Sequence, residues 1–278
     1  MNFRKSIFLL IFCFSIIGAS GKTYYSKNCE KAYYHLLNLE YEKVDSILDI
    51  EQEINADNLF VLYFRHYNSF TKYYTNPGSL KAEVLFDLFE ELRLKAKTID
   101  NNSFWKEYFH AEMLLQEALL HLNEQNYLTG FFKLRNTYFV AKETVEKSII
   151  THPAEKTLAI TQALFSAIPE QYQWILKLLS IDASLTQSRK KLDRLAVYPM
   201  LYFRQECIML RAALDLHLVG EAELAFNYLK KNNDPGESSL FYNYLLINTA
   251  NFAGKNDIAL ELIQEIDQKA FYRFPFLF

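Results

Sequence analysis

The sequence predicts an all-α protein: a right-handed α-solenoid of stacked antiparallel helical hairpins, with about a dozen helices. Only 7 glycines and 6 prolines among 278 residues leave few chain breakers for a many-stranded β-protein. Hydrophobic residues make up 50% of the chain and charged residues 23%, a composition typical of folded proteins. One short pattern also occurs twice, shifted by 34 residues, which is typical of a stacked helical array: Gly220, Ala225 and Leu229, then Gly254, Ala259 and Ile263.

Residues 25–58 form the first expected hairpin. Apolar residues spaced three and four apart share one side of a helix. A turn at Leu39 to Tyr41 separates two such helices, and a segment rich in turn formers closes the hairpin at Ile54 to Asn58. The apolar positions of the two helices are Ala32, Leu36 and Leu37, then Val44, Ile47 and Leu48.

Seven further helices are expected between residues 59 and 198, where capping and breaking residues separate the apolar segments. Ser79 and Ser103 are the expected N-caps of two of them. The helices are Leu59–Tyr74, Leu80–Ala96, Phe104–Leu122, Tyr127–Ile150, Pro153–Ile168, Pro169–Leu179 and one through Arg189–Arg194 that ends before Pro199.

The first of these helices carries an aromatic stripe. Most of it should be core, because aromatic side chains bury large areas, and we expect a minority of its tyrosines to face a groove. The stripe comprises Phe60, Tyr63, Phe64, Tyr67, Phe70 and Tyr74.

The N-terminus has the layout of a secretory signal peptide. Arg4 and Lys5 precede an apolar run over residues 6–18, and small residues follow at positions 18–21. We therefore expect residues 1–20 to be removed on export and residues 21–278 to form a single helical-repeat domain. An uncleaved N-terminal anchor is the alternative, and only then is contact with a membrane expected.

Charge and cysteine content exclude some functions. The net charge of −3 gives no reason to expect a nucleic acid partner. Cys29 and Cys207 lie 178 residues apart, which in a solenoid places them several repeats from each other, so we expect two free, buried thiols.

Residues 25–58, 206–239 and 240–273 resemble tetratricopeptide repeats, with Glu51 and Asn232 in place of the usual small residue. The middle of the chain resembles a more specific group. Gly130, Lys133, Arg135 and Tyr138 follow its G-x-x-K-x-R-x-x-Y helix, and residues 164–179 follow its S-x-x-P segment and apolar helix; Ser180-Ile181 replaces its glycine pair.

This group comprises the eukaryotic tetratricopeptide-repeat-39 family and secreted helical-repeat proteins of Gram-negative bacteria. The resemblance implies an exported α-solenoid of the periplasm or cell envelope, without known chemistry, cofactor or catalytic residues. Bacterial members continue into a further helix pair near Phe274 to Phe276, so we expect this array to lack a regular C-terminal cap.

The expected function is a non-enzymatic scaffold or adaptor that binds a peptide or protein segment. In such arrays the first helix of each hairpin lines a concave surface, which suits peptide recognition. Tyrosine and asparagine offer flat apolar area and amide hydrogen bonds. The 34-residue frame places five candidates on this surface: Tyr33, His217, Tyr244, Asn248 and Asn251.

A metal-dependent enzyme is the alternative function. His110, Glu117 and His121 are spaced i, i+7 and i+11, so they share one helix face and could converge on a metal ion. Helix-flanking side chains explain the same spacing, and the sequence has no nucleophile elbow, P-loop or short zinc-protease motif.

Overall fold

The computed structural model describes residues 25–76, 78–98, 104–198, 203–233 and 238–266. Within these ranges the chain forms thirteen α-helices and no strand, which confirms the predicted all-α class. The expected signal segment, Ser103 and the region near Phe274 to Phe276 lie outside the described residues. None of the described helices is both long and apolar enough to cross a bilayer.

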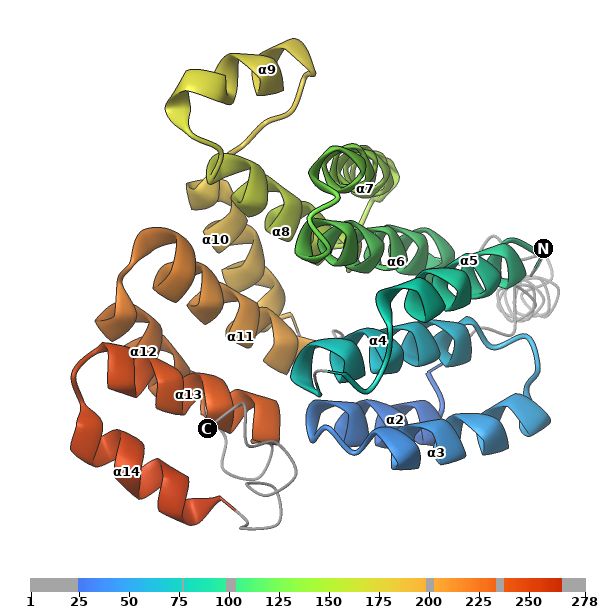
Figure 1. Cartoon of the computed structure of the whole chain (residues 1–278), viewed down its shortest axis with the longest axis horizontal. Helices are drawn as coiled ribbons and strands as arrows, with labels where there is room; N and C mark the ends of the chain where they lie inside the picture. The colour runs from blue at the N-terminus through green and yellow to red at the C-terminus, as the bar shows by residue number, and fades with distance from the viewer. Residues whose placement is uncertain (1–24, 77, 99–103, 199–202, 234–237, 267–278) are drawn as a thin grey trace, which may run out of the picture.

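Twelve of the helices pair into six antiparallel hairpins (Figure 1), and we call the first helix of each pair the inner helix because these helices contact one another from pair to pair. The inner helices are α2 (Lys27–Leu37), α4 (Leu59–Thr75), α6 (Phe104–Asn123), α8 (Ala154–Ser166), α11 (Arg204–Leu214) and α13 (Leu240–Phe252). The outer helices are α3 (Tyr41–Ile54), α5 (Ala82–Thr98), α7 (Tyr127–Lys147), α10 (Leu185–Ala196), α12 (Ala222–Asn232) and α14 (Asn256–Glu265).

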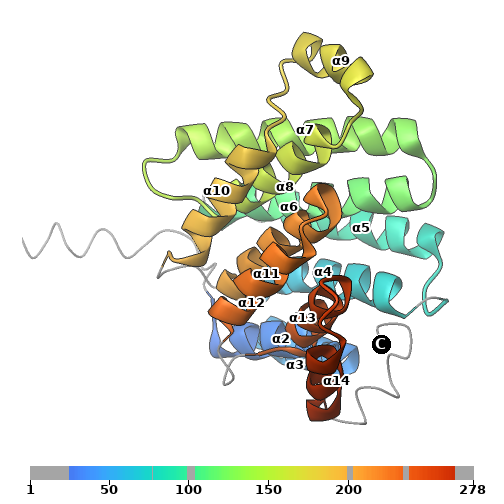
Figure 2. The same cartoon turned by 90° about the vertical axis from the view of Figure 1, so that its left-hand side faces the viewer.

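One short excursion interrupts this alternation between α8 and α10. A 3₁₀ turn (Glu170–Tyr172) leads into α9 (Gln173–Leu178), which stands away from the hairpins in both Figure 1 and Figure 2. The single helix expected from Pro169 to Leu179 is thus split. The start of α5 was predicted two residues too early, since this helix begins at Ala82 rather than Leu80. The expected cap of this helix was also wrong, because the Ser79 hydroxyl donates to the carbonyl of Lys72.

The inner helices close on one another. Each contacts the next, from α2 through α4, α6, α8 and α11 to α13, and α13 returns to contact α2. At this junction the backbone N–H of Leu240 donates to Oδ1 of Asn38, across 202 residues of sequence. The inner helices therefore meet one another around the array instead of lining one continuous trough.

The two predicted glycine corners are equivalent turns. Gly220 follows the π-helical segment (Asp215–Val219) that extends α11, and Gly254 follows α13; their φ values are +79° and +71°, the left-handed conformation that glycine adopts without steric cost. Among the described residues, three other than glycine adopt it as well: Leu39, Gln125 and Ser180, with φ of 57°, 60° and 57°. Several turns of the array are therefore made by residues other than glycine, which the sequence does not mark as turns by their type.

The central core is aromatic, as the stripe on α4 predicts. Phe60, Tyr63 and Phe64 are fully buried, and the Tyr63 ring stacks on Phe109 of α6 with centroids 4.5 Å apart. Cys29 and Cys207 are buried in this core as free thiols, as expected.

The G-x-x-K-x-R-x-x-Y segment holds α7 in place. A Cβ on Gly130 would lie 2.7 Å from Cγ of Leu122, so only glycine allows α7 to approach α6 this closely. Lys133 pairs with Glu117 of α6. The hydroxyl of Tyr138 accepts a hydrogen bond of 3.0 Å from the backbone N–H of Asp182, beyond α9. These residues therefore have a packing role.

Candidate functional site

A buried charge cluster lies where the inner helices meet. Lys156, in the first turn of α8, is 1% exposed. Its Nζ is 2.9 Å from Oε2 of Glu112 on α6 and 2.8 Å from Oε2 of Glu206 on α11. The Thr157 hydroxyl donates to the other oxygen of Glu112, and the Tyr67 hydroxyl of α4 donates to the other oxygen of Glu206. Four helices thus share one network of charged hydrogen bonds.

The network keeps Lys156 protonated. Burial disfavours its ammonium form, but Glu112 and Glu206 outweigh this and raise the pKa of Lys156 well above its ordinary value. Burial also raises the pKa of Glu112, against the opposing effect of Lys156. The ammonium lies over the rings of Phe203 and Tyr108, 5.2 and 5.5 Å from their centroids. An amine held this way is suited to joining helices, because a nucleophilic lysine must lose its proton.

An open groove of about 660 Å³ lies beside this cluster, and Tyr67 belongs to both. It is formed by four inner helices, α2, α4, α6 and α13, and most of its lining is apolar. We call it the inner groove. Its lining residues are Leu36, Leu37, Leu39, Tyr67, Phe70, Thr71, Tyr74, Thr75, Leu119, Leu122, Asn123 and Phe241.

The inner groove has a fixed frame. Leu36, Leu37 and Leu39 form a buried part of its wall, and Phe70, Leu119 and Phe241 are partly exposed. The volume lies within the range of about 300–1,000 Å³ that is usual for ligand sites. Thr71 and Tyr74 add hydroxyl groups to the apolar walls, whereas the Thr75 hydroxyl already donates to the carbonyl of Thr71 and the Asn123 amide to Tyr73. Such a surface can bind an apolar segment and orient it through a few hydrogen bonds.

The five predicted binding residues occupy different environments. Tyr33 is 7% exposed and packs between Phe64 and Phe203, so it belongs to the core and presents no surface to a partner. Its position on an inner helix is the expected one, but closure of the array buries that side.

The other four candidates lie nearer the surface. Tyr244 is partly buried, and its ring stacks on Phe241 of the inner groove with centroids 6.3 Å apart. Asn248 uses its amide to donate to the carbonyl of Tyr244. Asn251 and His217 are exposed, His217 in the π-helical segment (Asp215–Val219) that extends α11. None of the four lines the inner groove directly, and their role in binding stays a prediction.

Some residues that line the inner groove, although not among the five predicted binding residues, could be recognised weakly in the sequence. Tyr67, Phe70 and Tyr74 belong to the aromatic stripe on α4, from which a few tyrosines were expected to face a groove. Phe241 lies one helical turn before the predicted Tyr244. Leu119 and Leu122 have no distinguishing pattern, because nothing local separates a groove leucine from a core leucine.

The alternative metal ligands do not gather into one site. Glu117 is paired with Lys133, and the His121 ring stacks on Phe86 with centroids 4.2 Å apart. His110 faces a separate pocket between α5 and α6. Among the described residues, no three histidine, cysteine, aspartate or glutamate side chains are grouped so that they could hold a metal ion.

Comparison of the chain with protein-family models, with curated proteins and with solved structures gives no match.

Proposed function

We propose that the protein is a non-enzymatic interaction protein that binds an apolar peptide or protein segment in the inner groove. The observation that carries this proposal is the groove itself: an apolar recess of about 660 Å³ whose walls come from four helices distant in sequence. Helical walls anchored in a common core are pre-organised, which reduces the entropic cost of binding. An amphipathic partner helix could place its apolar residues into a groove of this kind.

The test compares two phenylalanines of α13. Phe241 lines the inner groove, whereas Phe252, at the other end of the helix, is 66% exposed and lies outside it. Peptides selected from a displayed library on the wild-type protein should bind at least tenfold more weakly to Phe241→Glu. Their affinity for Phe252→Glu, which adds the same charge to the same helix, should be unchanged.

Two results would contradict the proposal. The library could yield no binder to the folded wild-type protein, or the selected peptides could bind Phe241→Glu as tightly as wild type. Circular dichroism melts of both variants establish that each is folded at the temperature of the assay.

We also propose that the protein is exported and acts in the cell envelope of a Gram-negative bacterium. This rests on the charged start, short apolar run and small residues of the N-terminal segment. The mass of the protein recovered from a periplasmic fraction tests it. A chain beginning at Gly21 supports export with cleavage, and an intact chain found only in the cytoplasm contradicts it.

A further inference from the structure

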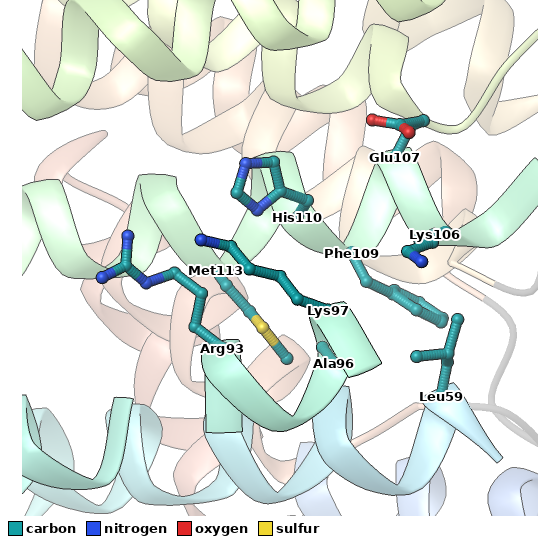
Figure 3. Close-up of a pocket in the computed structure, with 9 residues that line it drawn as sticks. All are labelled: Leu59, Arg93, Ala96, Lys97, Lys106, Glu107, Phe109, His110 and Met113. Atoms are coloured by element: carbon teal, nitrogen blue, oxygen red, sulfur yellow. The ribbon is translucent and has the colours of Figure 1, made fainter. Parts of the chain in front are cut away.

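A second pocket opens between α5 and α6, on the outer side of the array and apart from the inner groove. We call it the α5–α6 pocket. It holds about 140 Å³, roughly ten times the minimum space for one water molecule, so a compact ligand fits it. Figure 3 shows its nine lining residues: Leu59, Arg93, Ala96, Lys97, Lys106, Glu107, Phe109, His110 and Met113.

The floor of the pocket is apolar and firmly held. Leu59, Phe109 and Met113 are buried in the core, and Ala96 of α5 is partly buried. The thioether of Met113 and the ring of Phe109 are polarizable surfaces that suit the carbon skeleton of a ligand. A bare inorganic ion would leave this floor without a partner.

The wall of the pocket is positively charged. Its lining contains three cationic side chains, Arg93, Lys97 and Lys106, and one carboxylate, Glu107, in a chain whose net charge is −3. In Figure 3 the side chain of Lys97 extends from α5 to just below the ring of His110 on α6, and Arg93, also on α5, lies beyond the Lys97 ammonium. The positive charges of Lys97 and Arg93 act on the imidazole of His110. Burial lowers the pKa of His110, and Lys97 and Arg93 lower it further, against opposing effects of Glu107 and Glu117.

Arg93 has unused hydrogen-bonding capacity. One of its terminal nitrogens is paired with Glu90, but its Nε is buried and has no hydrogen-bond partner among the described residues. A buried donor without a partner is destabilising, and an anionic acceptor in the pocket would satisfy it. A guanidinium is also well suited to carboxylate and phosphate oxygens.

From this combination we infer that the α5–α6 pocket binds a small organic anion: a carboxylate or phosphate monoester on a compact apolar body. The head group lies against Arg93 and Lys97, and the apolar body rests on Leu59, Phe109 and Met113. The site is independent of peptide binding in the inner groove, since the two share no residue.

Isothermal titration calorimetry with four probes tests the site. Benzoate and phenyl phosphate carry both features, benzyl alcohol lacks the charge, and inorganic phosphate lacks the apolar body. The inference predicts that at least one of the first two binds tenfold or more tightly than both single-feature probes. The ratio of benzoate to phenyl phosphate affinity identifies the preferred head group.

Variants locate the binding. Arg93→Gln with Lys97→Gln should weaken the better anion at least tenfold. The control is Lys81→Gln with Lys95→Gln, which removes the same charge. Lys81 immediately precedes α5 and Lys95 lies on it, both are exposed and neither lines the pocket, so the affinity should be unchanged. Ala96→Leu keeps every charge but fills the pocket, and it should abolish binding while the protein still melts cooperatively.

The inference is overturned if neither benzoate nor phenyl phosphate binds the full chain at millimolar concentration. It is equally overturned if the two charge-removing double variants bind alike, because the attraction is then not local. Binding to anionic lipid vesicles without binding to the soluble anions would point to a membrane surface and also contradict it.

Discussion

Lys156 joins three inner helices through charge that is shielded from water. With Lys156→Met the carboxylates of Glu112 and Glu206 lose their shared cation, and breaking such a buried pair costs about 3–5 kcal/mol. Repulsion between the carboxylates favours protonation in the folded state. The loss in unfolding free energy, measured with urea, should therefore be largest at pH 7 and smaller at pH 5.

A triple variant separates charge from packing. Lys156→Met combined with Glu112→Gln and Glu206→Gln removes the uncompensated carboxylates and should recover most of the stability. If the single Lys156→Met variant were as stable as wild type at pH 7, or if its loss did not depend on pH, the cluster would not hold the helices as described.

His66 makes stability depend on pH in the acid range. Its ring is buried against Phe89, its Nδ1 donates to Oε1 of Gln116 at 2.7 Å, and burial lowers its pKa to about 3. The unfolded chain binds a proton near pH 6.5, while the folded chain does not until about pH 3. The stability from neutral His66 is thus complete above pH 6.5 and lost as pH falls toward 3, at about 1.4 kcal/mol per unit.

His66→Gln removes this dependence. At pH 7 the variant should be less stable than wild type, because stacking on Phe89 is lost. The difference in unfolding free energy between the two proteins should become smaller as pH falls from 6.5 to 4. His217→Gln is the control, since His217 is exposed. Denaturant unfolding at several pH values gives the free energy of unfolding of both variants. If this free energy fell with pH by the same amount in wild type and in His66→Gln, the account would be contradicted.

At the scale of elements, helix ends show how left-handed corners arise without glycine. Ser180 ends α9 with a φ of 57°, its N–H donating to the carbonyl of Lys177 and the next N–H to that of Leu176. This is the hydrogen-bonding pattern of a Schellman end, in which glycine usually occupies the left-handed position. The helix thus closes in the usual geometry with a residue that strains its backbone.

Ser180→Gly should therefore stabilise the protein by about 0.5–1 kcal/mol, because relief of the left-handed strain exceeds the added entropy of the unfolded chain. Ser148→Gly is the matched control. Ser148 ends α7 with an ordinary φ of −83°, so glycine there should be neutral or destabilising. Thermal melts of wild type and both variants give the melting temperatures that test this. An increase in the Ser148 variant alone would contradict the explanation.

Local signals in the sequence predicted most elements, and their limits have physical causes. Gly220 and Gly254 identified two corners because glycine favours positive φ. Leu39, Gln125 and Ser180 gave no such signal, since residues with a Cβ rarely adopt that conformation. The start of α5 was misplaced because Ser79, the residue expected to cap it, donates its hydroxyl to the carbonyl of Lys72, and the helix begins at Ala82.

At the scale of the whole molecule, closure of the inner helices determines which residues can meet a ligand. The repeat period places a residue on the inner side of the array but carries no information on how far the array curves. Tyr33 is consequently core, whereas Tyr67 reaches both the inner groove and Glu206, 139 residues away. Contacts over such distances in the sequence leave no local pattern, and neither the charge cluster nor the inner groove could be predicted from it.

Hydrogen exchange at the Leu240 amide tests closure most directly. Leu240 begins α13, so its N–H has no partner within the helix and depends on Oδ1 of Asn38, 3.0 Å away. NMR should show this amide protected in wild type and exchanging at least tenfold faster in Asn38→Ala, with protection retained in Asn38→Asp. The Tyr242 amide, capped by Ser239, should be unchanged throughout. A Leu240 amide that exchanges rapidly in wild type, or equally in wild type and Asn38→Ala, would contradict closure of the first hairpin on the last.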